Sequence, residues 1–144
     1  MGTQLIGDPG AEESESAEPG NSYVQVVNGD TVSLPTGTIV SVITGYAGSG
    51  AFTVKRTPTS GDFFMVGVVA GQTIPVGGSG RVTTEGLANV IMDGATTAGH
   101  LCLASASTAG DGTDSSSVTS GKTIGVILNT IGSAGKAYVY VHKV

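Results

Sequence analysis

The sequence predicts an all-β protein, a small β-barrel or sandwich with an extended N-terminal arm. Three observations lead to this fold class: the chain has 24 glycines, aromatic residues make up only 5% of it, and tryptophan is absent. Glycine, threonine and valine are less favourable than alanine in a helix, whereas short strands joined by tight turns accommodate them well. No segment carries the periodicity of a helix of ordinary length.

Composition divides the chain into an acidic arm, residues 1–22, and a β domain, residues 23–144. Between residues 8 and 20 the arm has no apolar residue larger than alanine or proline. Such a segment cannot bury enough surface to offset its ordering entropy. It is either a solubilising tail or an arm that docks on a partner, and we favour the arm. Its candidate contact residues are Leu5, Ile6, Glu12, Glu13, Glu15 and Glu18.

The charge distribution argues against two classes of partner. Residues 1–54 carry six acids and no lysine or arginine, so they account for −6 of the net charge of −5 and the remainder for +1. Nucleic acids and anionic membranes both bind clustered basic residues, and this sequence has no such cluster, so we expect neither as a partner. No apolar run approaches the about 20 residues of a membrane helix, and no signal peptide is visible. We therefore expect synthesis in a cytoplasm.

From residue 23 onwards, strand patterns alternate with turn signals. Asn28-Gly29 predicts a two-residue hairpin turn, because both residues tolerate positive φ. Residues 104–121 are rich in Ser, Thr, Gly and Asp and predict a long exposed loop. The predicted strands span residues 23–27, 31–34, 38–44, 51–55, 63–69, 73–76, 81–86, 87–92, 101–103, 123–128 and 136–141.

Two stretches of the β domain echo each other. Val66-Gly67-Val68-Val69 is followed by Gly80-Arg81-Val82, and Ile124-Gly125-Val126-Ile127 is followed by Gly135-Lys136-Ala137. A glycine inside a strand predicts a bulge or a close approach of another backbone. An internal repeat and chance recurrence in a chain rich in glycine and valine both fit this pattern.

The sequence predicts no catalytic, cofactor or metal site. His100 has serines around it, but no Gly-x-Ser-x-Gly motif is present, and most acids lie beside glycine in turns. Ser120-Gly121-Lys122-Thr123 has Ser116 where a phosphate-binding loop needs glycine. Ligands for a transition metal are too few. Cys102, between two leucines, is predicted to be a small buried hydrophobe.

Aromatic side chains are the remaining candidates for contacts. Phe63 and Phe64 are adjacent and point to opposite faces of an extended strand, so we expect one of them to meet a partner. Met65, Tyr138 and Tyr140 fit either a core or an interface.

A series of glycine and aliphatic motifs runs through residues 21–144. It comprises Gly29-Asp30-Thr31-Val32, Val66-Gly67-Val68-Val69, Gly80-Arg81-Val82, Gly86-Leu87-Ala88, Gly94-Ala95-Thr96-Thr97-Ala98-Gly99-His100-Leu101 and Ile124-Gly125-Val126-Ile127-Leu128. This series resembles the small phage capsid decoration proteins, also called cement or head-stabilising proteins. The family pattern often has an acid where His100 stands, and the acidic arm is not part of it.

The resemblance implies a compact β-barrel-like domain, often trimeric, on the outer capsid surface. We therefore expect a non-enzymatic virion protein without a cofactor, whose partners are the major capsid protein and its own copies in a homotrimer. A tail- or fibre-associated module that binds a host glycan is the alternative. The loop 104–121 motivates this alternative, but a tryptophan platform is missing. A small hydrolase is the third candidate and lacks a recognisable constellation.

Overall fold

The computed structural model describes residues 20–43, 52–59 and 64–142 of the chain. Nine strands within these residues form one sheet in the order β10-β9-β7-β8-β6-β2-β4-β3-β5. The described residues contain no helix, and therefore none that is long and apolar enough to cross a membrane. The predicted all-β fold is confirmed.

The strands are short, with the exception of β6, which has 14 residues. Residues 81–86 and 87–92, which the sequence divides into two strands, form this single strand. Gly86 lies in its middle with a φ of 115°, which favours glycine. The strands are β2 Ser22–Asn28, β3 Ile39–Val42, β4 Phe52–Arg56, β5 Met65–Ala70, β6 Ser79–Met92, β7 Leu101–Ala104, β8 Gly112–Ser115, β9 Thr123–Ile127 and β10 Gly135–His142.

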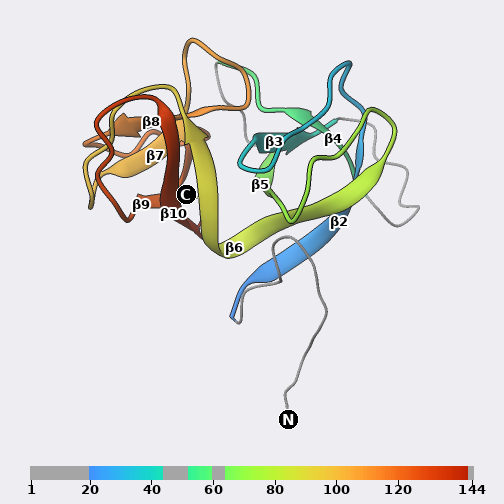
Figure 1. The fold of residues 1–144 in the computed structure, drawn as a ribbon, viewed down its shortest axis with the longest axis horizontal. Helices are drawn as coiled ribbons and strands as arrows, with labels where there is room; N and C mark the ends of the chain where they lie inside the picture. The colour runs from blue at the N-terminus through green and yellow to red at the C-terminus, as the bar shows by residue number, and fades with distance from the viewer. Residues whose placement is uncertain (1–19, 44–51, 60–63, 143–144) are drawn as a thin grey trace.

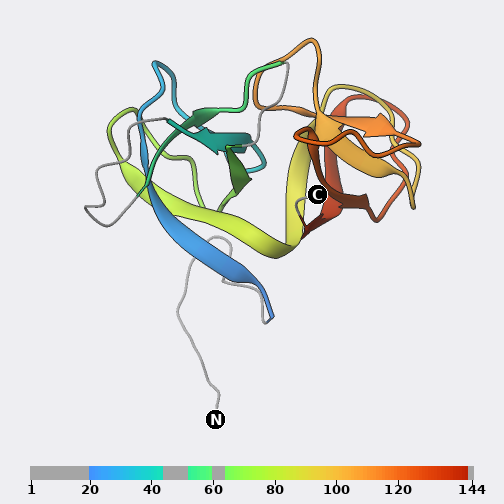
Figure 2. The same cartoon turned by 180° about the vertical axis from the view of Figure 1, so that it is seen from behind.

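The sheet closes into two five-stranded barrels that share β6 (Figures 1 and 2). In the first barrel, β2, β4, β3, β5 and β6 pair in that order, and β6 pairs back with β2. In the second barrel, β6, β8, β7, β9 and β10 pair in that order, and β10 pairs back with β6. The parallel contacts, β2–β4 and β6–β8, occupy the same place in the two rings. The chain therefore folds as a structural duplication.

Glycines at equivalent positions support this duplication. A Cβ atom on Gly67 would collide with the backbone oxygen of Thr83, and one on Gly125 would collide with the backbone oxygen of Tyr140. Each glycine therefore permits the same close approach, between the fourth and the last strand of its barrel: β5 and β6 in the first, β9 and β10 in the second. Of the two explanations that the sequence leaves open, an internal repeat and chance recurrence, the strand pairing supports the internal repeat.

One turn is also repeated. Gly37 and Gly99 have φ values of 95° and 92°. Gly37 precedes β3 and Gly99 precedes β7, which are equivalent strands of the two barrels. The N–H of Gly37 donates to the carbonyl of Val69, and the N–H of Gly99 donates to the carbonyl of Ile127. These paired bonds extend the repeat to segments that have little sequence similarity.

Each barrel encloses an apolar core, and the second core extends into the first barrel. Ile39, Met65 and Val68 come from the first barrel, yet they pack in the same buried cluster as the interior of the second. The barrels therefore form one packed body. The first core contains Val26, Leu34, Val40, Val54, Val69, Ile74 and Val82. The second contains Ala88, Val90, Met92, Cys102, Ala104, Ile124, Ile127, Ala137, Val139 and Val141.

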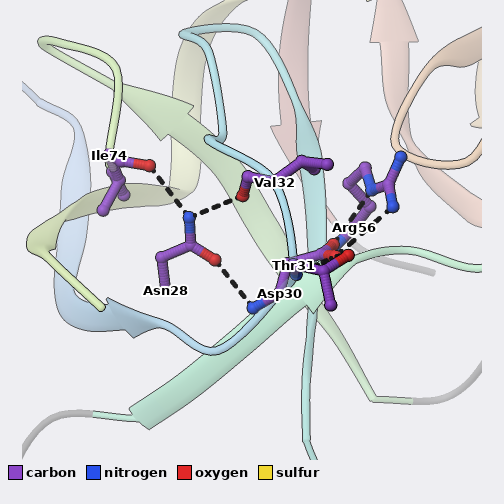
Figure 3. A network of polar contacts seen from close by, with 6 residues as sticks. All are labelled: Asn28, Asp30, Thr31, Val32, Arg56 and Ile74. Atoms are coloured by element: carbon purple, nitrogen blue, oxygen red, sulfur yellow. Dashed lines mark hydrogen bonds and ion pairs between the residues drawn. The ribbon is translucent and has the colours of Figure 1, made fainter. Parts of the chain in front are cut away.

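The predicted hairpin turn at Asn28-Gly29 is wrong. β2 pairs with β4 and β6, and the N–H of Gly29 donates to the carbonyl of Val54. The Asn28 side chain is buried and donates to the carbonyls of Val32 and Ile74, as Figure 3 shows. The Asn28 amide thus links the loop that follows β2 to the segment around Ile74, whereas an exposed asparagine would favour a tight turn.

The prediction of an exposed loop over residues 104–121 is wrong in part. β8 lies within it and pairs with β7 and β6. Gly110 joins the barrels, because its N–H donates to the carbonyl of Thr57 and its carbonyl accepts from the N–H of Ile39. This segment is held by backbone pairing rather than by apolar side chains, so its hydrophobicity does not reveal the strand. The strand predicted over residues 73–76 is likewise a turn with one bridge, between Leu34 and Ile74.

Candidate interaction surfaces

Most predicted contact residues lie outside the described part of the chain, namely Leu5, Ile6, Glu12, Glu13, Glu15, Glu18 and Phe63. Phe64 precedes β5 and is 52% exposed, while its carbonyl accepts from the N–H of Val42. Met65 is buried in the core. The role of Phe64 as a partner contact stays a prediction.

The outer face of β9 and β10 carries a group of exposed apolar side chains, which we call the β9–β10 face. Its members are Val126, Leu128, Tyr138 and Tyr140, and they are between 38% and 49% exposed. Tyr140 lies opposite Val126 in the ladder, and the N–H of Leu128 donates to the carbonyl of Tyr138. The four residues are therefore neighbours on one surface.

The sequence pattern predicts only part of this face. The alternation in residues 136–141 places the tyrosines and the valines on opposite sides of β10, but it does not say which side is buried. Val126 and Leu128 were missed as surface residues because the run from Thr123 to Leu128 is almost continuously apolar. An alignment of the two glycine-centred strands is the signal that would have shown that Val126 occupies the position equivalent to Val68.

A cavity of about 210 Å³ lies where the two barrels meet. Arg81 is the one charged residue in its lining, and the guanidinium carbon lies 5.0 Å from the centre of the Tyr23 ring, within the range of a cation–π contact. Tyr138 also lines the cavity, so the cavity adjoins the β9–β10 face. The full lining consists of Tyr23, Thr36, Gly37, Val69, Ala70, Arg81, Thr83, Leu87, Ala88, Asn89 and Tyr138.

An ion pair fixes the loop after β2 to β4 (Figure 3). The Nε of Arg56 lies 2.9 Å from Oδ2 of Asp30, and the backbone N–H of Arg56 donates to the same oxygen. Burial alone would raise the pKa of Asp30, but the hydrogen bonds from Arg56 and from the Thr31 N–H, together with the Arg56 charge, lower it to about 2. The pair is therefore a structural clasp in the first barrel.

The second barrel has a clasp of its own. Nδ1 of His100 lies 2.7 Å from Oδ1 of Asp114, and the Thr97 N–H donates to the other oxygen of this carboxylate. Burial raises the pKa of Asp114, and the hydrogen bonds from His100 and Thr97 outweigh that effect and lower it. His100, the histidine considered for catalysis, thus holds the turn at residues 97–100 against β8.

Cys102 is fully buried, which confirms its interpretation as a small core residue. Burial raises the pKa of its thiol to about 12, and the nearby charges of Asp93 and Asp114 act in the same direction. A thiol of this kind stays protonated at neutral pH and is a poor nucleophile. Across residues 20–43, 52–59 and 64–142, no three His, Cys, Asp or Glu side chains gather as metal ligands would.

No protein family matches the sequence, and no curated protein matches it. Among solved structures, the chain is similar to the N base of the head fiber protein gp8.5 of bacteriophage phi29, with a TM-score of 0.56 and 8% sequence identity. The similarity covers 84% of this chain and 95% of that chain. At this identity the comparison establishes a common fold, so this chain has the fold of the base of a phage head fiber.

Proposed function

We propose that this chain is a structural protein of a phage virion, a decoration protein that binds the outer surface of the major capsid protein shell and stabilises it. The observation that carries the proposal is the shared fold with a phage head fiber base over 84% of the chain. The resemblance of residues 21–144 to capsid decoration proteins points the same way. In this role the protein acts by binding and has no enzymatic activity.

Stabilisation of a shell by such a protein is additive. The two barrels form a rigid body, because they share β6 and a joint core. In a homotrimer, each copy contributes one body and one acidic arm. The arm's carboxylates pair with basic residues of the capsid protein, and Leu5 and Ile6 enter an apolar pocket. Because the contacts are linked, modest individual contacts give high avidity.

Co-sedimentation with purified shells that lack this chain tests the proposal. The full chain is expected to sediment with the shells and to raise the temperature at which they break open. Failure of the full chain to bind the outer surface of these shells would refute the decoration role.

The contribution of the arm is tested separately, by deletion of residues 1–20. The deletion is expected to lower shell occupancy while the circular dichroism of the β body stays unchanged. A variant with Glu12, Glu13, Glu15 and Glu18 all changed to Gln isolates the charge contribution. Unchanged occupancy after the deletion would remove the arm from the mechanism and leave the role of the body intact.

The second candidate is a tail- or fibre-associated module that binds a host glycan. The cavity where the two barrels meet favours this candidate, because Tyr23 and Tyr138 supply aromatic rings at the cavity wall and Asn89 supplies an amide. Purified protein that binds host cells without capsids, and loses this binding in Tyr138→Ala, would support this candidate. Binding to shells but not to cells would exclude it.

A further inference from the structure

The duplication assigns each residue of the β9–β10 face an equivalent in the first barrel. Thr83 lies opposite Val68 as Tyr140 lies opposite Val126, and the next position in each ladder follows the same register. The equivalent pairs are Val68 and Val126, Ala70 and Leu128, Arg81 and Tyr138, and Thr83 and Tyr140.

These equivalent surfaces differ sharply in burial. Val68 and Thr83 are 0% and 1% exposed, whereas Val126 and Tyr140 are 38% and 45% exposed. Val68 belongs to the same buried cluster as the interior of the second barrel. On the first barrel, Val68 and Thr83 are therefore covered where the barrels meet, while Ala70 and Arg81 are partly buried at the wall of the cavity there. On the second barrel, Tyr138 borders that cavity, and within the described residues no barrel lies over Val126 and Tyr140.

The residues of the β9–β10 face are those of a contact surface. Where the first barrel has Ala70, Arg81 and Thr83, the second has one leucine and two tyrosines. The second face is thus more apolar and more aromatic than the covered one, although it is the more exposed of the two. Tyrosine is enriched in protein interfaces, because a large rigid ring gives contact area at little entropic cost. None of the four side chains is charged, so the surface that covers the face is also largely uncharged.

We propose that the β9–β10 face is a self-association surface, covered in solution by a second copy of this chain. The second copy is the occupant because the structure already seats a barrel of this fold on the equivalent face of the first barrel. A standard interface buries about 800 Å² on each partner, more than four side chains supply. The contact therefore extends to Leu87 and Asn89 of β6, which pair with Tyr140 and Tyr138.

Sedimentation equilibrium of the full chain, without capsids, tests this surface. The wild-type chain is expected to have a mass above that of one chain at micromolar concentration. The double variant Tyr138→Lys/Tyr140→Lys is expected to weaken association about 30-fold or more, as loss of a central aromatic anchor does. The matched controls Val76→Lys and Val118→Lys are expected to associate as wild type, because these valines are 57% and 54% exposed outside the face.

Val126→Lys provides a second route if the double variant loses its fold, which circular dichroism and thermal unfolding detect. A wild-type chain that stays a single copy at high micromolar concentration would overturn the proposal, as would undiminished association of a folded Val126→Lys variant. Association lost equally in the Val76→Lys control would also overturn it. Because the measurement contains no capsid, failure here leaves the binding of the chain to the shell untouched, although a chain that stays a single copy would also remove the homotrimer from the proposed function.

Discussion

The two barrels have the same strand order, yet they fill their cores differently. At equivalent positions, the first barrel has Asn28 and Val54, whereas the second has Met92 and Gly112. A Cβ atom on Gly112 would lie 2.7 Å from Sγ of Cys102 and 3.0 Å from Sδ of Met92. Cys102 and Met92 therefore occupy the space that a side chain at position 112 would need, whereas Val54 fills the equivalent place in the first barrel. The common element of the two barrels is thus the backbone pairing, and the side chains at equivalent core positions differ in size and polarity.

The outer surfaces of the barrels teach a second lesson. Val68 and Thr83 of the first barrel are buried, whereas their equivalents in the second barrel, Val126 and Tyr140, are exposed, and the exposed face carries the aromatic residues. The two barrels are thus alike in the residues that close them, such as Gly67 and Gly125, and unlike where they meet other surfaces. The difference between the copies points to the interaction surface that a single barrel would not reveal.

The largest expected effect concerns the paired glycines. Gly67→Ala and Gly125→Ala should each destabilise the fold by about 3 kcal/mol or more, because the new methyl group meets a backbone oxygen that cannot rotate away. Urea unfolding measures the change. Gly94→Ala and Gly132→Ala serve as controls within about 0.5 kcal/mol of wild type, since nothing lies within 4 Å of a Cβ there. A large loss in one test variant with wild-type stability in the other would break the equivalence of the two barrels, and wild-type stability of both would contradict the close approach itself.

The second-largest effect concerns Asn28, whose buried amide stands where the second barrel has Met92. Asn28→Ala should cost about 2 kcal/mol, because the carbonyls of Val32 and Ile74 and the N–H of Asp30 lose their partner. Asn28→Met, which introduces the residue found at the equivalent place in the second barrel, should not restore stability. Thermal unfolding of both variants measures this. Full stability of Asn28→Met would show that volume alone matters at this position.

The acid response should differ between the barrels. The folded pKa of Asp30 is about 2, below its ordinary value of 3.8, so its stabilising effect is complete above pH of about 4 and is lost as the pH falls towards 2. We expect about 1–2 kcal/mol from this group, because Arg56 is partly exposed. Asp30→Asn should flatten the stability profile in that range, and Asp114→Asn, which removes a more exposed carboxylate, should change it less. A steeper loss in Asp114→Asn would reverse the comparison.

The smallest effect concerns the protection of a buried thiol from chemical labelling rather than the stability of the fold. The Cys102 thiol should react with an alkylating reagent only when the second barrel opens, since the thiol is buried and its pKa is raised to about 12. Val40→Cys in a Cys102→Ala background places a thiol at the equivalent site of the first barrel. Both thiols should be protected to a similar degree, because the barrels share β6 and a joint core. Labelling rates that differ widely would show that the barrels open independently.

Much of the fold follows from the sequence, and the reason is local. The alternation in residues 136–141 and the aliphatic run around Gly67 fix strands through side chains that must face a core. Gly67 and Gly125 pointed to a repeat without deciding between it and chance recurrence, although a glycine in a strand does predict a backbone contact. What the pattern could not give is long-range: β8 has no apolar run, and its place follows from backbone pairing with β7 and β6.

The contact residues were predicted less completely, for a different reason. Alternation shows that Tyr138 and Tyr140 share a side of β10, but burial depends on which barrel covers that side. Asn28 shows the same limit, since Asn-Gly predicts a tight turn from local preference. Its amide instead bonds to Ile74, which is remote in the sequence. Tertiary partners of this kind are not encoded in short patterns.

Single-particle imaging of shells with and without this chain tests the decoration role most directly. The proposed function predicts additional density of the size of one or more two-barrel bodies on the outer surface of the shell, at positions that repeat with the capsid symmetry. This density should be absent from shells prepared without the chain. Shells incubated with saturating protein that show no added outer density, or that hold it only inside the shell, would contradict the proposed function.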